Sequence, residues 1–230
     1  MAGTSGKLQS EIAYEKINDM ILNLELLPGE HISESALSQR FQISRTPIRD
    51  GLKRLEKEGL VTISKNRGAS VVDFSEKQIK EIGHVRLAQD ILSIQLALYY
   101  GSEADFALLN QLADVCEQRA VQGDVVGRIR GDTAFHLAIT RISGNQLLLR
   151  QQRTVYQLVH LIQVRKYSTI ADSMEQIYHH KPLVSALRRR DEATAVRLCC
   201  EHLREFYSLD QHILNGYITR AANKRTDSLD

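Results

Sequence analysis

The positions of proline and glycine divide this chain into two unlike parts. Pro28 and Pro47 precede residue 75, together with the glycines at 29, 51, 59 and 68, whereas Pro182 is the one proline that follows it. Proline and glycine interrupt helices more strongly than other residues do. We therefore expect two domains, residues 1–75 with short elements and residues 76–230 with long helices.

The composition excludes several classes of protein. The chain has 230 residues, 43% of them hydrophobic and 25% charged, with a formal net charge of +2, so any polyanion must be bound by a local patch. No apolar run reaches the roughly 18–20 residues that span a bilayer, and no segment near Met1 resembles a signal peptide. Three cysteines, two of them adjacent at 199 and 200, argue against a disulfide framework. We expect a mainly α-helical cytoplasmic protein without a membrane segment.

Three short helices are predicted in the first part. Apolar residues three or four positions apart over 14–24 indicate an amphipathic helix. A second helix, capped by Ser33 or Ser35, precedes a third that Ser44 is expected to cap and Gly59 to end. Each helix has a buried stripe, which indicates that the three pack together.

A hairpin should follow these helices. The β-prone segments 60–63 and 70–72 flank 65–68, where Gly68 lies in the bend. Three helices followed by a β-hairpin predict a winged helix-turn-helix.

Positive charge is concentrated on the third helix and the hairpin tip. Residues 40–67 contain eight basic and three acidic side chains, whereas residues 1–39 contain two basic and six acidic ones. Arg45 and Arg49 lie one turn apart, so both can reach into a major groove, and Thr46 can contact a base or a phosphate. Arg67 beside Gly68 lets the hairpin tip approach a DNA backbone or minor groove. The alternative, a solvated helix face, is the usual meaning of an isolated charge run.

The motifs SRTPIR at 44–49 and LEKEGL at 55–60 resemble the GntR family of bacterial transcription regulators. The resemblance runs from about residue 12 to residue 72. It implies operator binding as a homodimer, with Arg45, Thr46, Arg49 and the wing around Gly68 as contacts. Asp50-Gly51 depart from the usual Glu-Ala, and glycine inside a helix costs roughly 1 kcal/mol relative to alanine. We therefore expect a less stable third helix.

The second part is predicted to be an antiparallel helical bundle, because it shows helical periodicity and no strand pattern. The expected helices lie near 76–101, 103–121, 125–143, 145–167, 171–189 and 191–216. The first of them, at 76–101, has a potential interruption at Gly83.

Four polar residues of the bundle are candidates for a metal site. Asp132 and His136 are four residues apart and share a helix face. His180 and His202 each lie eleven residues from Asp191, so an antiparallel helix pair that turns at Asp191 would bring them level. One carboxylate and three imidazoles suit a borderline divalent ion with open positions. Spacing alone leaves the alternative of a simple Asp–His hydrogen bond and ordinary core histidines.

The motifs DTAFH at 132–136 and SGNQLL at 143–148, with the segment EHL at 201–203, resemble the FCD ligand-binding domain of the FadR subfamily. The resemblance covers about residues 76–215. It implies a divalent metal on Asp132, His136, His180 and His202, with zinc as the first candidate and nickel or manganese as others. His179 is the nearest competitor of His180.

The same resemblance implies that Arg86 contacts an acidic effector, although Gln89-Asp90 depart from the usual Leu-Glu. We expect a dimeric, metal-containing repressor whose binding to double-stranded operator DNA is modulated by a small carboxylate or sugar acid. The ligand would replace water on the metal and favour one arrangement of the two winged helices. Two alternatives stay open: a metal-dependent hydrolase tethered to a DNA-binding domain, or a purely structural metal. The absence of a persuasive separate base or nucleophile argues against an enzyme.

Overall fold

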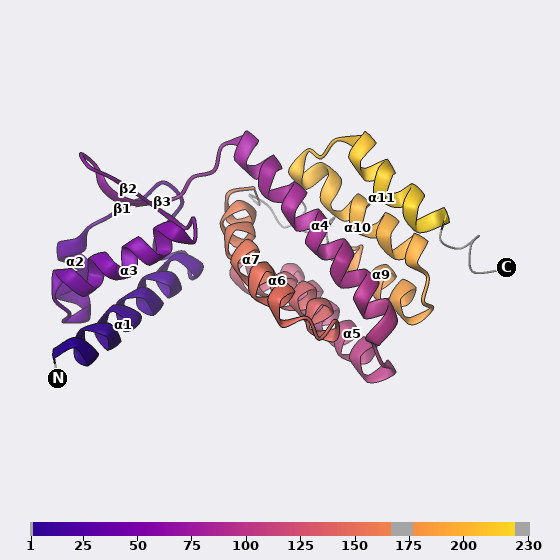
Figure 1. The fold of residues 1–230 in the computed structure, drawn as a ribbon, viewed down its shortest axis with the longest axis horizontal. Helices are drawn as coiled ribbons and strands as arrows, with labels where there is room; N and C mark the ends of the chain where they lie inside the picture. Colours follow the sequence, from indigo (N-terminus) through magenta and orange to yellow (C-terminus); the bar gives the residue numbers. More distant parts are fainter. Residues whose placement is uncertain (1, 167–176, 224–230) are drawn as a thin grey trace. The chain divides into compact units, whose positions relative to one another are not determined.

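The computed structural model describes residues 2–166 and 177–223, and side chains from residue 8 onward. The chain separates into two compact units, Met1–Phe74 and Ser75–Asp230. The predicted fold class is confirmed, because the first unit is three helices with a small sheet and the described part of the second is helical (Figure 1). None of the described helices is long and apolar enough to cross a membrane.

The first unit is a winged helix-turn-helix. Its helices are α1 (Ala2–Leu22), α2 (Glu34–Phe41) and α3 (Arg45–Lys57), and its strands are β1 (His31–Ile32), β2 (Val61–Ser64) and β3 (Gly68–Val71). The antiparallel sheet has the order β1-β3-β2. The two-residue strand β1 was not predicted, because a strand so short has no detectable alternation. At the hairpin bend Gly68 has a φ of 71°, in the left-handed region that favours glycine.

The two predicted helix caps differ in outcome. Ser33 caps α2, and its Oγ accepts a hydrogen bond from the Ala36 backbone N–H at 3.3 Å. Ser44 occupies the N-cap position of α3 with extended backbone, but its side chain accepts no capping hydrogen bond. The predicted cap at Ser44 is therefore wrong in its side-chain interaction and right in its position.

Gly51 lies where α3 packs against α1. A Cβ atom at this position would lie 2.9 Å from the Tyr14 backbone nitrogen and 3.3 Å from the Ala13 carbonyl carbon. Because both neighbours are backbone atoms, they cannot move aside as a flexible side chain would. Gly51 therefore allows the two helices to approach closely, and its low helix propensity describes only part of its effect.

Replacing Gly51 with alanine should destabilise the first unit by about 1–3 kcal/mol, because overpacking outweighs the gain in helix propensity. Urea unfolding followed by circular dichroism would measure the change. Gly216→Ala is the matched control, since Gly216 lies in α11 (Gln211–Asn223) with open space around it. This control should be neutral or stabilising. A stabilised Gly51→Ala variant would show that α1 and α3 tolerate the extra carbon.

The second unit is a helical bundle. Two of its helices begin with a capping box, one at Ser75 and the other at Ser102. In addition to α11, its described helices are α4 (Glu76–Tyr100), α5 (Glu103–Val121), α6 (Val125–Ile142), α7 (Gln146–Lys166), α9 (His180–Arg188) and α10 (Glu192–Tyr207).

Two helix predictions in this unit need correction. Gly83 does not interrupt α4; it lies against α10, where a Cβ atom would be 2.5 Å from the Tyr207 Cβ. The helix expected over 191–216 ends at Tyr207, where Ser208 adopts a left-handed φ of 51° as the C-cap; beyond it, Asp210 binds Lys80 at 2.9 Å. Of the helix expected over 171–189, the part at 171–176 lies outside the described residues.

Candidate functional site

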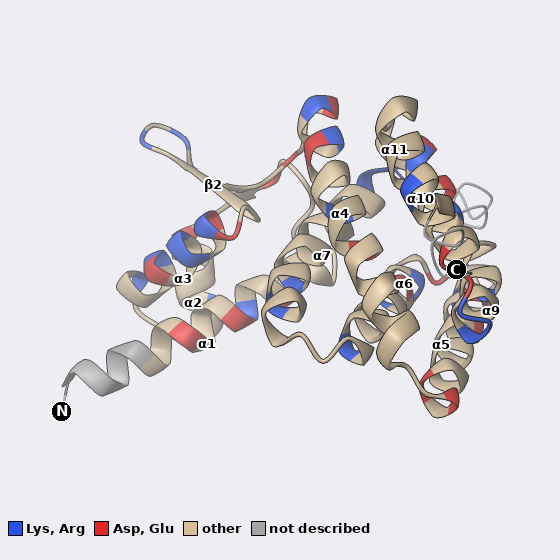
Figure 2. Ribbon diagram, turned by 45° about the vertical axis from the view of Figure 1, so that its right-hand side comes forward, with Lys and Arg blue, Asp and Glu red and all other residues tan. Residues whose placement is uncertain are grey.

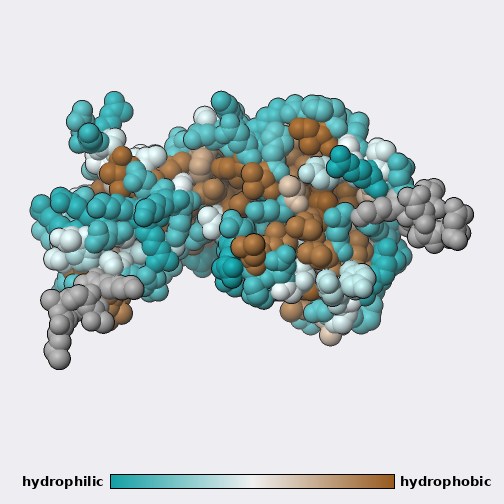
Figure 3. All heavy atoms as spheres, viewed as in Figure 1, coloured by the Kyte–Doolittle hydropathy of each residue, from teal (hydrophilic) through white to brown (hydrophobic). Residues whose placement is uncertain are grey.

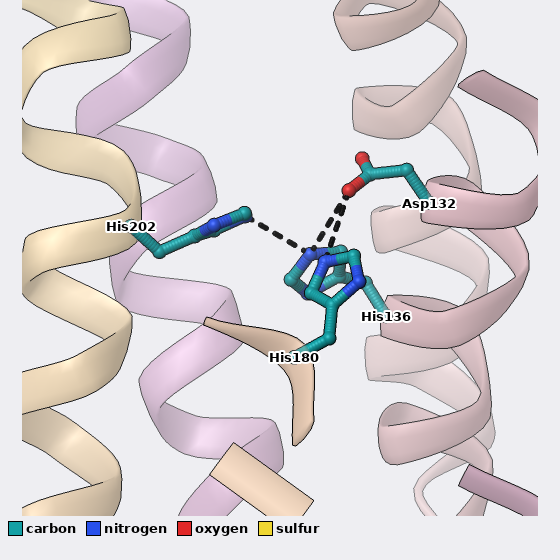
Figure 4. Close-up of side chains that lie close together, drawn as sticks. All are labelled: Asp132, His136, His180 and His202. Atoms are coloured by element: carbon teal, nitrogen blue, oxygen red, sulfur yellow. Dashed lines mark hydrogen bonds and ion pairs between the residues drawn. The ribbon is translucent and has the colours of Figure 1, made fainter. Parts of the chain in front are cut away.

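Four polar side chains converge inside the bundle. Asp132 and His136 project from α6, His180 from the first turn of α9, and His202 from α10 (Figure 4). All four are buried, and their nearest ligand atoms lie within 4.8 Å of one another. The structure thus brings together the four residues that the sequence suggested as metal ligands.

The distances within this cluster suit a cation. Asp132 Oδ1 lies 3.2 Å from His180 Nε2 and 3.6 Å from His136 Nε2, which itself lies 3.2 Å from His202 Nε2. Asp132 Oδ1 and His180 Nε2 have no hydrogen-bond partner within the described part of the chain. Buried polar atoms without partners are unfavourable. A divalent ion among them would accept their lone pairs, so the residues fit the metal that the fold family implies.

The protonation states also favour a cation. Burial lowers the pKa of His180 to about 4, against the opposing effect of Asp132. Burial and the neighbouring His136 lower the pKa of His202 well below its usual value. Burial alone would raise the pKa of Asp132, but His136, His180 and Arg86 hold it well below the ordinary range. At neutral pH, His180 and His202 are therefore neutral and Asp132 is ionised, which are the forms that bind metal.

Local geometry explains why His180, and not His179, joins the cluster. The α9–α10 connection at 189–191 places the His180 and His202 rings 5.4 Å apart. The His180 ring also stacks on Phe135, with centroids 4.2 Å apart. His179 is the N-cap residue of α9 and is half-buried beside the cluster.

Asp90 on α4 links the cluster to a buried polar network. Its carboxylate accepts hydrogen bonds from Arg86 Nε at 3.2 Å, Gln152 Nε2 at 2.6 Å and the Tyr156 hydroxyl at 3.0 Å. Asp90 Oδ2 also lies 3.8 Å from His136 Nδ1. Metal-binding histidines usually direct their second nitrogen toward a carboxylate, which leaves Nε2 free for the metal. At 3.8 Å, Asp90 is beyond hydrogen-bond distance of His136 and instead places a negative charge on the Nδ1 side of its ring.

Arg86 is fully buried under this network and does not line the cavity at the cluster. Its guanidinium donates to Asp90 and to the Tyr207 hydroxyl, and its Nη2 lies 3.9 Å from Asp132 Oδ2. The surrounding Tyr156, Tyr207 and Asp90 raise its pKa well above the usual value, despite burial. Arg86 therefore lies between two carboxylates.

Sequence reasoning missed most of this second layer. Gln163 Nε2 donates to Asp132 Oδ2 at 2.8 Å, and Gln152 binds Asp90. A signal was present: Gln152, Tyr156, His160 and Gln163 are polar residues three or four positions apart on α7, and all are buried. Such a stripe on the inner face of a helix indicates a buried polar network.

The predicted DNA contacts lie in the first unit. Arg45, Thr46 and Arg49 are exposed along the first turns of α3, and Arg67 and Gly68 are exposed at the hairpin tip. Figure 2 shows basic residues on α3 and at this tip. Arg49 Nε donates to Glu34 Oε2 at 2.6 Å, which leaves its two Nη groups available for a base edge. An exposed, cationic helix beside a cationic hairpin is an arrangement that suits duplex DNA.

Comparisons with known proteins agree with both units. Residues 9–71 match the gntR family of bacterial regulatory proteins, and residues 81–205 match the FCD domain. An uncharacterised HTH-type transcriptional regulator of Bacillus subtilis, YdhC, is 25% identical over 83% of this chain and 89% of its own length. The Nta operon transcriptional regulator of Aminobacter aminovorans is 25% identical over 91% and 98%. The Escherichia coli HTH-type transcriptional repressor GlaR is 27% identical over 83% and 90%.

Solved structures show the same fold. Escherichia coli McbR/YncC superposes with a TM-score of 0.75 at 20% identity, covering 90% of this chain and 97% of that protein. A GntR regulator from Rhodococcus sp. RHA1 superposes with a TM-score of 0.77 at 18% identity, covering 88% and 96%. The chain therefore belongs to the GntR family of bacterial regulatory proteins, as a DNA-binding transcriptional regulator with an FCD effector domain.

Proposed function

We propose that this regulator is a metal-containing repressor that holds operator DNA through α3 and the wing. The exposed Arg45, Thr46 and Arg49 carry this proposal, because they lie on one helix next to the basic hairpin tip. Glu34 accepts a hydrogen bond from Nε of the exposed Arg49, which leaves the Nη pair for the two acceptors of a guanine edge.

Arg49→Ala should weaken operator binding by about 1–3 kcal/mol if the side chain makes this bidentate contact. Fluorescence anisotropy at one fixed salt concentration, with a duplex selected from a random pool, would measure the loss. Arg188→Ala is the matched control, since Arg188 is an exposed arginine of the second unit. Unchanged affinity in Arg49→Ala would remove this residue from the recognition set.

The proposed metal is zinc, held by Asp132, His136, His180 and His202. One carboxylate and three imidazoles form a donor set that zinc accepts readily, and nickel or manganese are the other candidates. When bound, the ion supplies an electrophilic position for a ligand oxygen. Gln163 would orient Asp132 toward it through its hydrogen bond, and Asp90 would keep a negative charge beside Nδ1 of His136.

The proposed effector is a small organic acid that enters beside the metal. A ligand changes operator affinity only through its different affinities for the two arrangements of the DNA-binding units. Arg86 would act through Asp90 and Asp132, holding the charge balance of the pocket, since it does not line the cavity.

We further propose a homodimer that pairs through α4. Val85, Leu92 and Tyr99 are 50%, 42% and 80% exposed and recur every seven residues along this helix. Figure 3 shows hydrophobic residues along the course of α4 on this face. A second copy of the chain would cover this stripe, as in other isologous interfaces.

We propose sensing, not turnover, for the second unit. The matched relatives are transcriptional regulators, and the Asp90 and Ser93 side chains at the cavity are already hydrogen-bonded. The deciding experiment titrates organic acids into the zinc-loaded chain bound to its selected duplex. Release or tightening of DNA with the acid recovered unchanged supports a sensor; metal-dependent product formation would contradict it.

A further inference from the structure

The cavity beside the four-residue cluster of Asp132, His136, His180 and His202 has a mainly apolar wall. Ile94 of α4, Ile139 of α6, Leu183 of α9 and Leu198 of α10 line it, together with His136, His180 and His202. A ligand whose polar end lies at the cluster would place the rest of its structure against these aliphatic side chains. Such a wall offers no hydrogen bonds.

The polar groups that share this lining are already engaged. Ser93 Oγ donates to the Gln89 carbonyl at 2.8 Å and lies 3.1 Å from Thr140 Oγ1. Asp90 accepts from Arg86, Gln152 and Tyr156. Outside the four-residue cluster, His179 Nδ1 is the one buried nitrogen or oxygen of the described lining side chains that lacks a hydrogen-bond partner. Outside the four-residue cluster, the described lining can therefore offer a ligand one additional hydrogen bond, at His179 Nδ1.

The lining of the cavity offers no charged partner for a second carboxylate. Around the cluster, the buried carboxylates of Asp90 and Asp132 are matched by the buried guanidinium groups of Arg86 and Arg128, so the formal charges sum to zero. A divalent ion changes this to +2. A carboxylate of the ligand that lies away from the ion would still be buried without a charged partner, which is strongly unfavourable. No lysine or arginine occurs among the described lining residues to receive a second carboxylate.

The space is also small. About 10 Å³ remains open in the cavity, enough for about one water molecule. Each carbon of a ligand must therefore displace wall side chains, so short ligands are favoured over long ones.

Within the proposed sensing function, on which this inference rests, we propose that the effector is a short aliphatic monocarboxylate. Its carboxylate lies at the four-residue cluster, with one oxygen toward His179 Nδ1. Its hydrocarbon part packs against Ile94, Ile139, Leu183 and Leu198. Polyhydroxylated sugar acids and dicarboxylates are excluded, because their hydroxyl groups or second carboxylate would be buried without partners. Each unpaired buried hydroxyl lowers affinity by roughly tenfold.

The test is calorimetric titration of the full-length, zinc-loaded chain with butyrate, isovalerate, gluconate and succinate. Butyrate or isovalerate should bind at least tenfold more tightly than gluconate or succinate. His179→Phe should retain zinc and bind butyrate about tenfold more weakly. Ile139→Thr should reduce the preference for butyrate over 3-hydroxybutyrate, while Val115→Thr, an exposed site on α5, should leave it unchanged.

The outcomes separate this inference from the proposed function. If zinc is retained and gluconate binds as tightly as butyrate or more tightly, the aliphatic class is overturned and metal-dependent sensing stands. If zinc is retained and none of the four acids binds, both the class and the acid effector are overturned. If the wild-type chain retains no zinc, the proposed metal site itself is refuted, and zinc content measured on the same sample identifies this case.

Discussion

Replacing His136 and His202 together with alanine is expected to abolish metal retention. The two Nε2 atoms lie 3.2 Å apart, on helices α6 and α10, and face the same point between the four ligands. Removing them leaves Asp132 and His180, and two ligands do not hold zinc against dialysis as four do. Zinc content should fall from about one ion per chain to background, measured by elemental analysis after dialysis against a weak chelator.

His212→Ala is the matched control, because His212 is exposed on α11 and should retain zinc. The double variant opens space in the core, so its circular dichroism should be recorded alongside the metal content. If it does not fold, His180→Gln gives a second test, since glutamine preserves volume better and removes one ligand. Normal zinc content in a folded double variant would refute the assignment of these ligands.

The convergence of Asp132, His136, His180 and His202 was predictable because it follows from helix periodicity. Asp132 and His136 share a face of one helix, and the equal spacing of His180 and His202 from Asp191 requires only an antiparallel pair. The role of Asp90 was not predictable in this way. Its partners come from α4, α6 and α7, and no local pattern specifies which buried polar residues of separate helices meet.

The fold shows the same difference between features set by local sequence and features set by contacts between distant segments. Capping residues and apolar periods locate most helices of both units, because these signals act within a few residues. The chain that follows the end of α10 at Tyr207 is fixed instead by a tertiary contact, because Asp210 binds Lys80 across 130 positions of sequence. Likewise, strand β1 exists because His31 and Ile32 pair with Ser70 and Ala69. Such tertiary contacts override or replace local preference.

Asp90→Leu is expected to destabilise the second unit by about 3–5 kcal/mol, because it leaves the buried Arg86 guanidinium without its main carboxylate partner. Gln152 and Tyr156 lose their acceptor in the same step. The variant should also bind zinc about 10–100-fold more weakly, since the negative charge beside His136 Nδ1 is lost. Urea unfolding of the metal-free chain would measure stability, with the second unit identified as the transition that zinc moves to higher urea.

A double-mutant cycle tests whether charge compensation is the cause. Arg86→Met in the Asp90→Leu background removes the uncompensated cation, so the double variant should be more stable than Asp90→Leu alone, with a coupling of about 1–3 kcal/mol. Arg197→Met is the control: it breaks the exposed Arg197–Glu201 pair, with side chains 47% and 41% exposed, and should change stability by less than about 1 kcal/mol. Additive effects of Arg86→Met and Asp90→Leu would show that the two side chains do not stabilise each other. In that case Asp90 acts on the site only through Gln152, Tyr156 and His136.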